Sequence, residues 1–413
     1  MKSLFEVLTV KEAFHKIINS IETTGDLKEE IDLLQALGRV TAEEIISPSV
    51  VPHFSRSTMD GFAVRARDTF GASESMPAFL DVKGDIPMGC VPPGDINPGE
   101  TMTIATGGML PPGADSVLMV EHTEKLDEKM LAAYKPVAPG ENVILRGEDL
   151  KEGEIILKKN HRIRPQDVGA LAAAGITGIN VFPRLKVAVI STGDELVPPD
   201  QKPQPGQVRD INSCALGAAI QSAGALPVLC GIIKDEASLL KKALEKAMEE
   251  ASLVLISGGS SVGTRDVTAK VIDELGGPGV LIHGISIRPG KPTIFGMAGE
   301  TPIFGLSGNP VSALVTFDLF VAPVIYKQRG LNPEEAVQAK IQARVKRNIP
   351  SAQGREDYIR VMLQEDETGE TWAVPIFGKS GLITTLVEAR GVVLIPQNKE
   401  GLEKGERVEV VLY

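Results

Sequence analysis

The sequence predicts an α/β multidomain protein: a doubly wound parallel-sheet domain with a discontinuous helical domain, an inserted β domain and a C-terminal β domain. Three observations lead to this fold class. Apolar strand patterns alternate with amphipathic helix patterns over residues 184–328, which is typical of a parallel sheet covered by helices. Short apolar runs punctuated by Pro and Gly fill residues 47–145 and 335–413, which is typical of small β domains. Helical patterns precede and follow the first of these regions, so we expect it to be an insertion.

Composition narrows the function classes before any motif is considered. The 413 residues carry a formal net charge of −11 and only 4% aromatic residues, which argues against a nucleic-acid binder. The three cysteines are far apart and the five histidines are scattered, so we expect neither a disulfide framework nor a zinc site. The sequence has no uninterrupted apolar run of about 18 residues and no signal-peptide pattern, so we expect a cytoplasmic protein with no membrane partner.

The discontinuous helical domain is predicted over residues 1–46 and 147–180. A T-x-x-E capping box at Thr9 opens one helix, and a second helix fits Leu27 to Leu37. A short Ala-rich helix from Pro165 to Ala174 follows the inserted domain. We assign packing roles to these helices.

The inserted β domain is predicted over residues 47–146. It contains Asp60 in the segment S-T-M-D-G-F-A-V and Thr106 in the segment I-A-T-G-G. Asp-Gly is an ordinary turn signal, so a structural role for Asp60 stays open beside a functional one. The same two interpretations apply to Thr106.

The doubly wound domain is predicted over residues 181–329. Strands are expected at Leu185–Ile190, Leu226–Ile233, Leu253–Ile256 and Ile303–Leu306, with helices at 212–223, 239–248, 267–275 and 309–326. Ligands bind such sheets outside the carboxyl ends of the strands, and three of those ends carry acids: Glu195, Asp235 and Asp266. Carboxylate oxygens suit a hard divalent cation, so the sequence favours Mg²⁺ over Zn²⁺.

A glycine-rich loop follows the strand at Leu253–Ile256. Its glycines let backbone N–H groups approach an anion closely, and two serine hydroxyls add donors. The candidate residues are Gly258, Gly259, Ser260, Ser261 and Gly263. These glycines could equally serve only to turn the chain after a strand, because a lone glycine loop is a weak signal.

Two further segments of this domain are candidate anion sites. Gly308 and Asn309 precede a helix whose first turn carries a proline, and free N–H groups at a helix start favour anions. The segment R-P-G-K-P provides Arg288 and Lys291, although both could be solvated surface cations. The chain has no Walker A motif and no nucleophile beside a base. The favoured chemistry is therefore positioning and metal-assisted anion transfer on a phosphate-bearing ligand.

Six motifs in order carry a resemblance over essentially the whole chain. They read STMDGFAV from Ser57, STGDEL from Ser191, SGGSSVGTRD from Ser257, RPGKP from Arg288, GNPVS from Gly308 and GR from Gly354. Together they resemble the molybdopterin molybdenumtransferase family, the MoeA family, which includes the gephyrin E domain. The resemblance implies Mg²⁺-dependent insertion of molybdate into adenylylated molybdopterin, which yields molybdenum cofactor and releases AMP. It also implies a homodimer and a transient contact with the molybdopterin adenylyltransferase of the preceding step.

The resemblance also implies roles for individual residues, motif by motif. Glu195, Asp235 and Asp266 are expected to hold Mg²⁺ at the pyrophosphate. Arg288, Lys291 and Ser312 match positions that bind molybdate or phosphate, and Arg355 and Ser380 are expected to complete that site from the last domain. Asp60 and Thr106 are expected to reach in from the β domain of the other subunit, with Asp149 nearby. Lys291 and Asp60 join the three acids as candidate catalytic residues.

Two other functions compete with this interpretation. A molybdopterin adenylyltransferase would share the doubly wound domain but would need neither the other domains nor the motif around Asp60. A non-catalytic scaffold like gephyrin in its clustering role would tolerate loss of the three acids, yet the sequence retains all of them. Molybdate insertion is therefore the favoured hypothesis.

Overall fold

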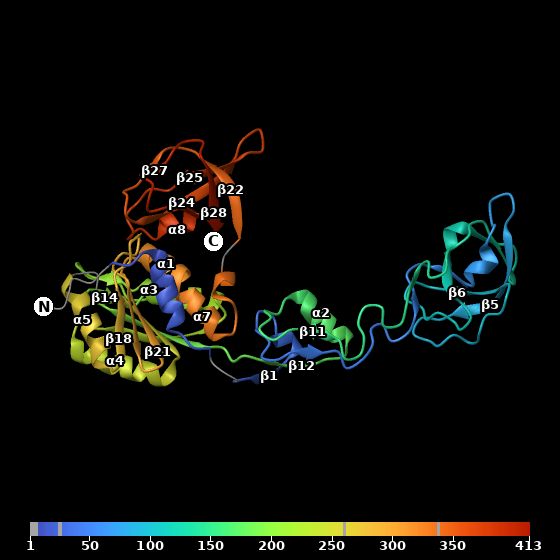
Figure 1. Ribbon diagram of the computed structural model, residues 1–413, viewed down its shortest axis with the longest axis horizontal. Helices are drawn as coiled ribbons and strands as arrows, with labels where there is room; N and C mark the ends of the chain where they lie inside the picture. The colour runs from blue at the N-terminus through green and yellow to red at the C-terminus, as the bar shows by residue number, and fades with distance from the viewer. Residues whose placement is uncertain (1–6, 24–26, 259–261, 337–338) are drawn as a thin grey trace. The chain divides into compact units, whose positions relative to one another are not determined.

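The computed structural model describes residues 7–23, 27–258, 262–336 and 339–413, with only the backbone described for 262–266 and 335–336. The chain separates into two compact units, Met1–Glu29 with Phe182–Tyr413, and Glu30–Val181. We call them the larger unit and the smaller unit and describe each by itself (Figure 1). Their mixture of a largely parallel sheet with helices, a separate β sheet and a C-terminal barrel confirms the predicted fold class.

Helix α1 (Val10–Asn19) begins at the predicted capping box, where the Glu12 N–H donates to the Thr9 hydroxyl at 3.3 Å. Its buried residues Ala13 and Ile17 join the core on one face of the sheet in the larger unit. The ammonium group of Lys16 also donates to the Leu281 carbonyl at 2.8 Å. The helix therefore belongs with the parallel sheet, which differs from its expected place in the discontinuous domain of residues 1–46.

The prediction of a second helix from Leu27 to Leu37 is wrong. Strand β1 (Glu29–Asp32) and the 3-10 helix η1 (Leu33–Gln35) lie there instead. Leu34 and Leu37 are 89% and 57% exposed, so the apolar residues of this segment do not form one buried helical face. Pairing of β1 with a distant strand has prevailed over local helix propensity.

The segments on either side of the inserted domain form one small core in the smaller unit. β1 pairs with β12 (Gly178–Val181), and β2 (Ile45–Ile46) pairs with β11 (Ile155–Leu157) beside helix α2 (Pro165–Ala173). The core residues are Leu33, Ala36, Ile45, Leu157, Ile163, Leu171, Ile179 and Val181. These two segments, far apart in sequence, thus form one core in which short strands contribute as much as helix α2 does.

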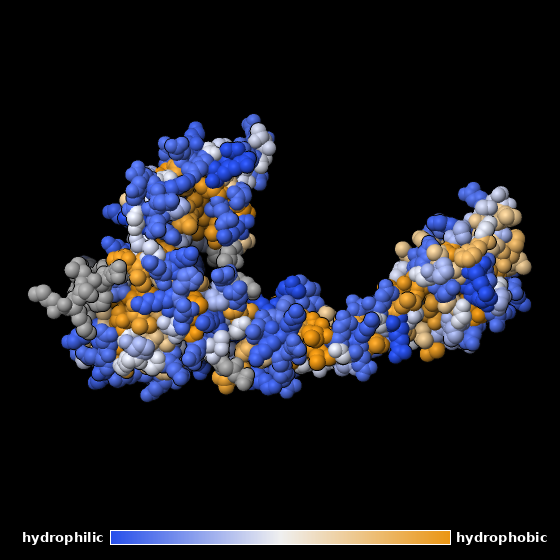
Figure 2. Space-filling view, viewed as in Figure 1, coloured by the Kyte–Doolittle hydropathy of each residue, from blue (hydrophilic) through white to orange (hydrophobic). Residues whose placement is uncertain are grey.

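The inserted β region of the smaller unit is a six-stranded sheet of order β7-β4-β6-β5-β9-β8. Its strands are β4 (Gly61–Val64), β5 (Ala78–Ile86), β6 (Glu100–Ile104), β7 (Ser116–Met119), β8 (Thr123–Lys125) and β9 (Met130–Ala133). Strands β3 (Arg56–Ser57) and β10 (Val143–Ile144) and the 3-10 helices η2 (Ala66–Thr69) and η3 (Val120–His122) complete it. In Figure 2 hydrophilic and hydrophobic residues are interspersed on its surface, where Phe70, Phe79 and Met88 are exposed.

A buried acid at the start of α2 stabilises the smaller unit in a pH-dependent way. Hydrogen bonds from the Arg164 side chain, with a further one from His161 at 2.6 Å, hold the pKa of Asp167 well below its ordinary value. A lowered pKa gives stability that is present above the unfolded-state pKa of about 3.9 and is lost as the pH falls below it. We expect Asp167→Asn to lower the free energy of unfolding by about 2 kcal/mol at neutral pH.

Calorimetric melting of the full chain at neutral and acidic pH checks this expectation. The difference between Asp167→Asn and the unsubstituted chain should shrink below about pH 4, because the carboxyl of the unfolded chain then takes up a proton while that of the folded protein stays ionised. The exposed Glu152→Gln serves as the control for loss of one acid in the same unit. A difference that stayed constant across this range would contradict the proposed origin of the stability.

The larger unit contains a six-stranded sheet of order β16-β13-β17-β21-β20-β18. Its strands are β13 (Lys186–Thr192), β16 (Leu226–Ile233), β17 (Leu253–Gly258), β18 (Pro278–His283), β20 (Ile294–Ala298) and β21 (Thr301–Leu306). The four predicted strands are β13, β16, β17 and β21. Where two of them pair with each other, they run parallel. Strands β18 and β20, which were not predicted, are antiparallel and extend the sheet at one edge.

Helices cover both faces of this sheet, as a doubly wound domain requires. Val187 and Leu255 pack toward α1, α3 (Asn212–Ser222) and the α6–α7 run, whereas Ala188 and Ile256 pack toward α4 (Ala237–Glu250) and α5 (Val262–Glu274). The run comprises α6 (Pro310–Thr316), the π-helical turn η4 (Phe317–Val321) and α7 (Ala322–Gln328), followed by η5 (Pro333–Ala336). Among the described helices it alone is long and apolar enough to cross a membrane, yet 67% of its most apolar window is buried, as in a core helix.

The C-terminal part of the larger unit is a β barrel. Its strands follow the order β24-β25-β22-β28-β26, and an additional β24–β26 pairing closes the sheet on itself. The elements are β22 (Lys340–Val345), β23 (Ile349–Pro350), β24 (Glu356–Glu365), β25 (Thr371–Pro375), α8 (Thr384–Glu388), β26 (Gly391–Ile395), β27 (Gly401–Leu402) and β28 (Arg407–Leu412). Strand β19 (Ile287–Arg288), from the doubly wound part, pairs in parallel with β24. Strands β14 (Leu196–Val197) and β15 (Val208–Arg209) form a separate pair.

Candidate functional site

The carboxyl ends of β13 and β16 bring two of the predicted acids together. The turn after β13 carries Asp194 and Glu195, and Asp235 lies just beyond β16. The Gly193 N–H donates to the Ile233 carbonyl at 3.2 Å, which ties the two strand ends together. The backbone N–H of Asp235 donates to Asp194 Oδ1 at 3.4 Å. Asp194 was missed from the sequence, although it is the first acid of the same S-T-G-D-E-L motif.

The electrostatics of this acidic cluster favour a cation. Burial raises the pKa of Asp235 above its ordinary value, and the negative charges of Asp194 and Glu195 raise it further. Mg²⁺ is commonly held by one or two carboxylates together with substrate phosphates, so an open group of carboxylate oxygens fits it. Within the described residues no three His, Cys, Asp or Glu side chains are grouped so as to hold a metal by themselves. The third predicted acid, Asp266, has its backbone in α5, and its side chain lies outside the described residues.

The two predicted glycine loops meet at the carboxyl ends of β17 and β21. A methyl group on Gly258 would lie 2.1 Å from the Thr192 carbonyl oxygen, so only glycine allows the two strand ends to approach this closely. Gly308 packs on Gly258 from the other side, with 3.6 Å between its ideal Cβ position and the Gly258 Cα. Gly259, Ser260 and Ser261 lie outside the described residues, and Gly263 is described only as backbone in α5.

The side chain of Asn212 links these two loops, a role that the sequence did not predict. Its side-chain amide donates to the Ser257 hydroxyl at 2.8 Å and to the Gly308 carbonyl at 2.9 Å. The residue is only 6% exposed at the start of α3. An asparagine at a helix start is typical of a helix cap. The sequence pattern therefore did not indicate that this side chain contacts Ser257 and Gly308.

The predicted cations of the anion site share one buried acid. Arg288 Nη1 lies 3.5 Å from Asp357 Oδ2, and Arg355 Nε lies 2.8 Å from Asp357 Oδ1. Lys291 is exposed on the same turn as Arg288. The structure therefore brings together Arg288 and Arg355, which are far apart in sequence, through an aspartate that was not predicted as a site residue.

A loop of the barrel contacts the start of α6. The Val311 N–H donates to the Ser380 carbonyl at 3.2 Å, and the ideal Cβ position of Gly381 lies 3.5 Å from Asn309 Oδ1. Ser312, by contrast, is only 4% exposed, so its hydroxyl is buried in the helix packing.

The remaining predicted residues lie in the smaller unit. The Thr106 N–H and hydroxyl both donate to Asp60 Oδ1, at 2.7 and 2.9 Å, and these hydrogen bonds lower the pKa of Asp60. Both side chains are exposed, so they present an ionised carboxylate to solvent. Asp149 is exposed on a different turn, where its N–H donates to the Val51 carbonyl at 3.1 Å.

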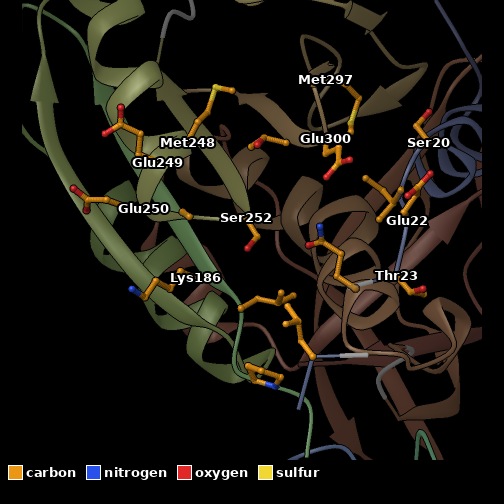
Figure 3. Close-up of a pocket in the computed structure, with 18 of the residues that line it drawn as sticks. Ser20, Glu22, Thr23, Lys186, Met248, Glu249, Glu250, Ser252, Met297 and Glu300 are labelled. Atoms are coloured by element: carbon orange, nitrogen blue, oxygen red, sulfur yellow. The ribbon is translucent and has the colours of Figure 1, made fainter. Parts of the chain in front are cut away.

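A pocket of about 1040 Å³ in the larger unit lies at the opposite ends of the strands. Lys186 at the start of β13, Ser252 just before β17 and Thr301 at the start of β21 line it. Figure 3 shows the side chains of Glu249 and Glu300 among those around it. Ligands of doubly wound sheets bind at the carboxyl ends, so we place the candidate site at the acids and glycine loops instead.

Comparison with known families covers most of the chain. Residues 8–175 match the MoeA N-terminal region (domain I and II), residues 188–327 match a probable molybdopterin binding domain, and residues 342–413 match the MoeA C-terminal region (domain IV). The three matched regions follow one another in the order expected from the six motifs.

Relatives and solved structures extend over the full length. A putative molybdopterin biosynthesis protein of Methanocaldococcus jannaschii is 37% identical, with all of both chains covered. The molybdopterin molybdenumtransferase of Bacillus subtilis is 33% identical over 98% of this chain and 94% of its own. A crystal structure of the molybdopterin biosynthesis MoeA protein from Pyrococcus horikoshii OT3 superposes with a TM-score of 0.85 at 33% identity, covering 99% of this chain and 100% of that one. The chain belongs to the MoeA family of molybdopterin molybdenumtransferases.

Proposed function

We propose that this protein inserts molybdate into adenylylated molybdopterin in an Mg²⁺-dependent reaction that forms molybdenum cofactor and releases AMP. One observation carries the proposal beyond family membership. Along the carboxyl edge of the sheet, the acids after β16 and β13 are followed by the glycine loops after β17 and β21. The barrel loop lies at the start of α6, and the cationic turn packs on the same helix, where the ideal Cβ position of Gly290 lies 2.7 Å from the Thr316 hydroxyl. An acidic end, an uncharged middle and a cationic end suit a ligand that carries a metal-bound pyrophosphate at one end and receives an oxyanion at the other.

The residues have distinct roles in this proposal. Glu195 and Asp235, with Asp266, hold Mg²⁺, which supplies positive charge at the pyrophosphate that is cleaved. Backbone N–H groups of the loops at Gly258 and Gly308 accommodate phosphate oxygens. The candidate oxyanion ligands are Arg288, Lys291, Arg355, Asn309, Ser312 and Ser380, although burial of Ser312 favours a supporting role for its hydroxyl. Arg can bind an oxyanion through two N–H groups, while Lys acts as a point charge.

We also propose that the protein works in the cytoplasm as a homodimer, in which Asp60 and Thr106 of one subunit act at the acids of the other. Their exposure and the ionised state of Asp60 support this role, because an acid intended for a second subunit must be accessible. The substrate is expected to come from a molybdopterin adenylyltransferase through a transient contact. Sedimentation measures the number of subunits. If the site is shared, mixed dimers should recover activity when one subunit carries Asp60→Asn and the other carries a different inactivating substitution.

The decisive experiment measures AMP release from adenylylated molybdopterin with and without molybdate and Mg²⁺. We expect release only when both ions are present. If the protein instead makes the adenylylated pterin from ATP and molybdopterin, it is an adenylyltransferase. If the folded protein catalyses neither reaction, a scaffold role replaces the enzymatic one.

A further inference from the structure

Asp357 is a fully buried acid that lies between two arginines from different parts of the larger unit. Its side chain is 0% exposed, whereas those of Arg288 and Arg355 are 61% and 36% exposed. Arg355 donates to both carboxylate oxygens, from Nε to Oδ1 at 2.8 Å and from Nη2 to Oδ2 at 3.5 Å. Arg288 donates from Nη1 to Oδ2, also at 3.5 Å. One carboxylate thus fixes the inner side of two guanidinium groups whose outer sides reach solvent.

The backbone around this acid joins the barrel to the segment of the doubly wound domain that carries Arg288. Arg288 and Asp357 are opposite each other in the parallel pairing of β19 with β24. The Glu356 N–H donates to the Ser286 carbonyl at 3.0 Å, and the Ser286 hydroxyl donates to the Gly354 carbonyl. These contacts hold the two arginine-bearing segments side by side, so the position of each guanidinium depends on the same short stretch of sheet.

We infer that Asp357 is a positioning residue for the oxyanion site: it orients Arg288 and Arg355 toward one anion and does not touch that anion itself. The inference deepens the proposed function and rests on it for the identity of the anion. Two arginines and one aspartate leave a net charge of one positive unit, to which Lys291 adds a second. A flexible arginine must lose side-chain freedom when it binds an anion, and a carboxylate that already holds it removes part of that cost.

Charge and orientation predict opposite effects for the same substitution, which makes the inference testable. Asp357→Asn removes a negative charge near the anion, so simple Coulomb attraction predicts tighter anion binding. If Asp357 acts through orientation, the released arginines bind the anion more weakly. We expect the dissociation constant for molybdate to rise about tenfold or more, as measured by equilibrium dialysis of the full-length protein with molybdate alone.

Conservative variants separate position from charge and from folding. Asp357→Glu keeps the charge but displaces it, so it should not restore molybdate affinity. Arg355→Lys keeps a cation but cannot contact both carboxylate oxygens, so it should also weaken binding, and Asp357→Asn should add little in the double variant. Asp357→Glu keeps a charged acid at this position, so it tests the inference if Asp357→Asn does not fold. Glu409→Gln removes an exposed barrel carboxylate paired with Lys340 and is the control.

The kinetic readout distinguishes this inference from the proposed function. We expect Asp357→Asn to raise the KM for molybdate while the KM for adenylylated molybdopterin stays within about twofold, a split that general destabilisation would not produce. Tighter molybdate binding by Asp357→Asn, or wild-type binding by Asp357→Glu, would overturn the inference and leave the proposed reaction intact. If molybdate binding weakens as expected but the wild-type protein releases no AMP, the proposed reaction fails and the arginine site remains an oxyanion site.

Discussion

Gly258→Ala is expected to lower the free energy of unfolding of the larger unit by about 3 kcal/mol or more and to abolish AMP release. The added methyl group would lie 2.1 Å from the Thr192 carbonyl oxygen and 2.3 Å from its hydroxyl, well inside contact distance. The residue also has φ +145°, where a side chain strains the backbone. The strand ends that carry the acid turn and the glycine loop must separate to relieve this collision. Denaturant unfolding and the AMP assay measure the two effects.

Gly276→Ala is the matched control for Gly258→Ala. Gly276 has φ +120° in the loop between α5 and β18, but a methyl group there meets no atom within 4 Å. It therefore reports backbone strain without collision, and we expect a cost of about 1 kcal/mol with AMP release unchanged. Equal destabilisation by the two variants would show that strain alone explains Gly258, and the close approach of the strand ends would then have no special role.

Local pattern was sufficient to predict the parallel strands and the capping box of α1. Strand β16 has the predicted bounds, Leu226–Ile233, and α1 begins at the predicted residue, because in both cases the signal lies within a few neighbouring residues. The helix expected from Leu27 to Leu37 failed for the opposite reason. Its outcome depends on β12, which lies almost 150 residues further along the chain and pairs with β1.

The site shows the same division between local and long-range information. Glu195 and Asp235 were predicted because each directly follows a strand whose place in a parallel sheet could be inferred. Asp357 looks like an ordinary charged residue beside Arg355 and Glu356, and only its complete burial against Arg288 distinguishes it. Asn212 was likewise taken for a helix cap, since its contacts to Ser257 and Gly308 span 45 and 96 residues.

Asp235→Asn is expected to lower the rate of AMP release by about 100-fold at a fixed Mg²⁺ concentration. A neutral amide binds Mg²⁺ more weakly than a carboxylate, so raising the Mg²⁺ concentration should recover part of the lost rate. The stability of the fold, unlike the rate, should not fall. Because burial and the negative charges of Asp194 and Glu195 all disfavour the charge of Asp235, its removal should leave the free energy of unfolding unchanged or slightly higher.

This opposition between activity and stability is what separates a metal-binding role from a structural one. An acid that served the fold would lose stability and activity together when neutralised, whereas like charges held side by side are tolerated where a cation offsets them. Asp200→Asn, at an exposed acid in the next loop, is the control and should leave both the Mg²⁺ requirement and the rate unchanged. If Asp235→Asn retains the wild-type rate and Mg²⁺ requirement, this cluster does not hold the catalytic cation.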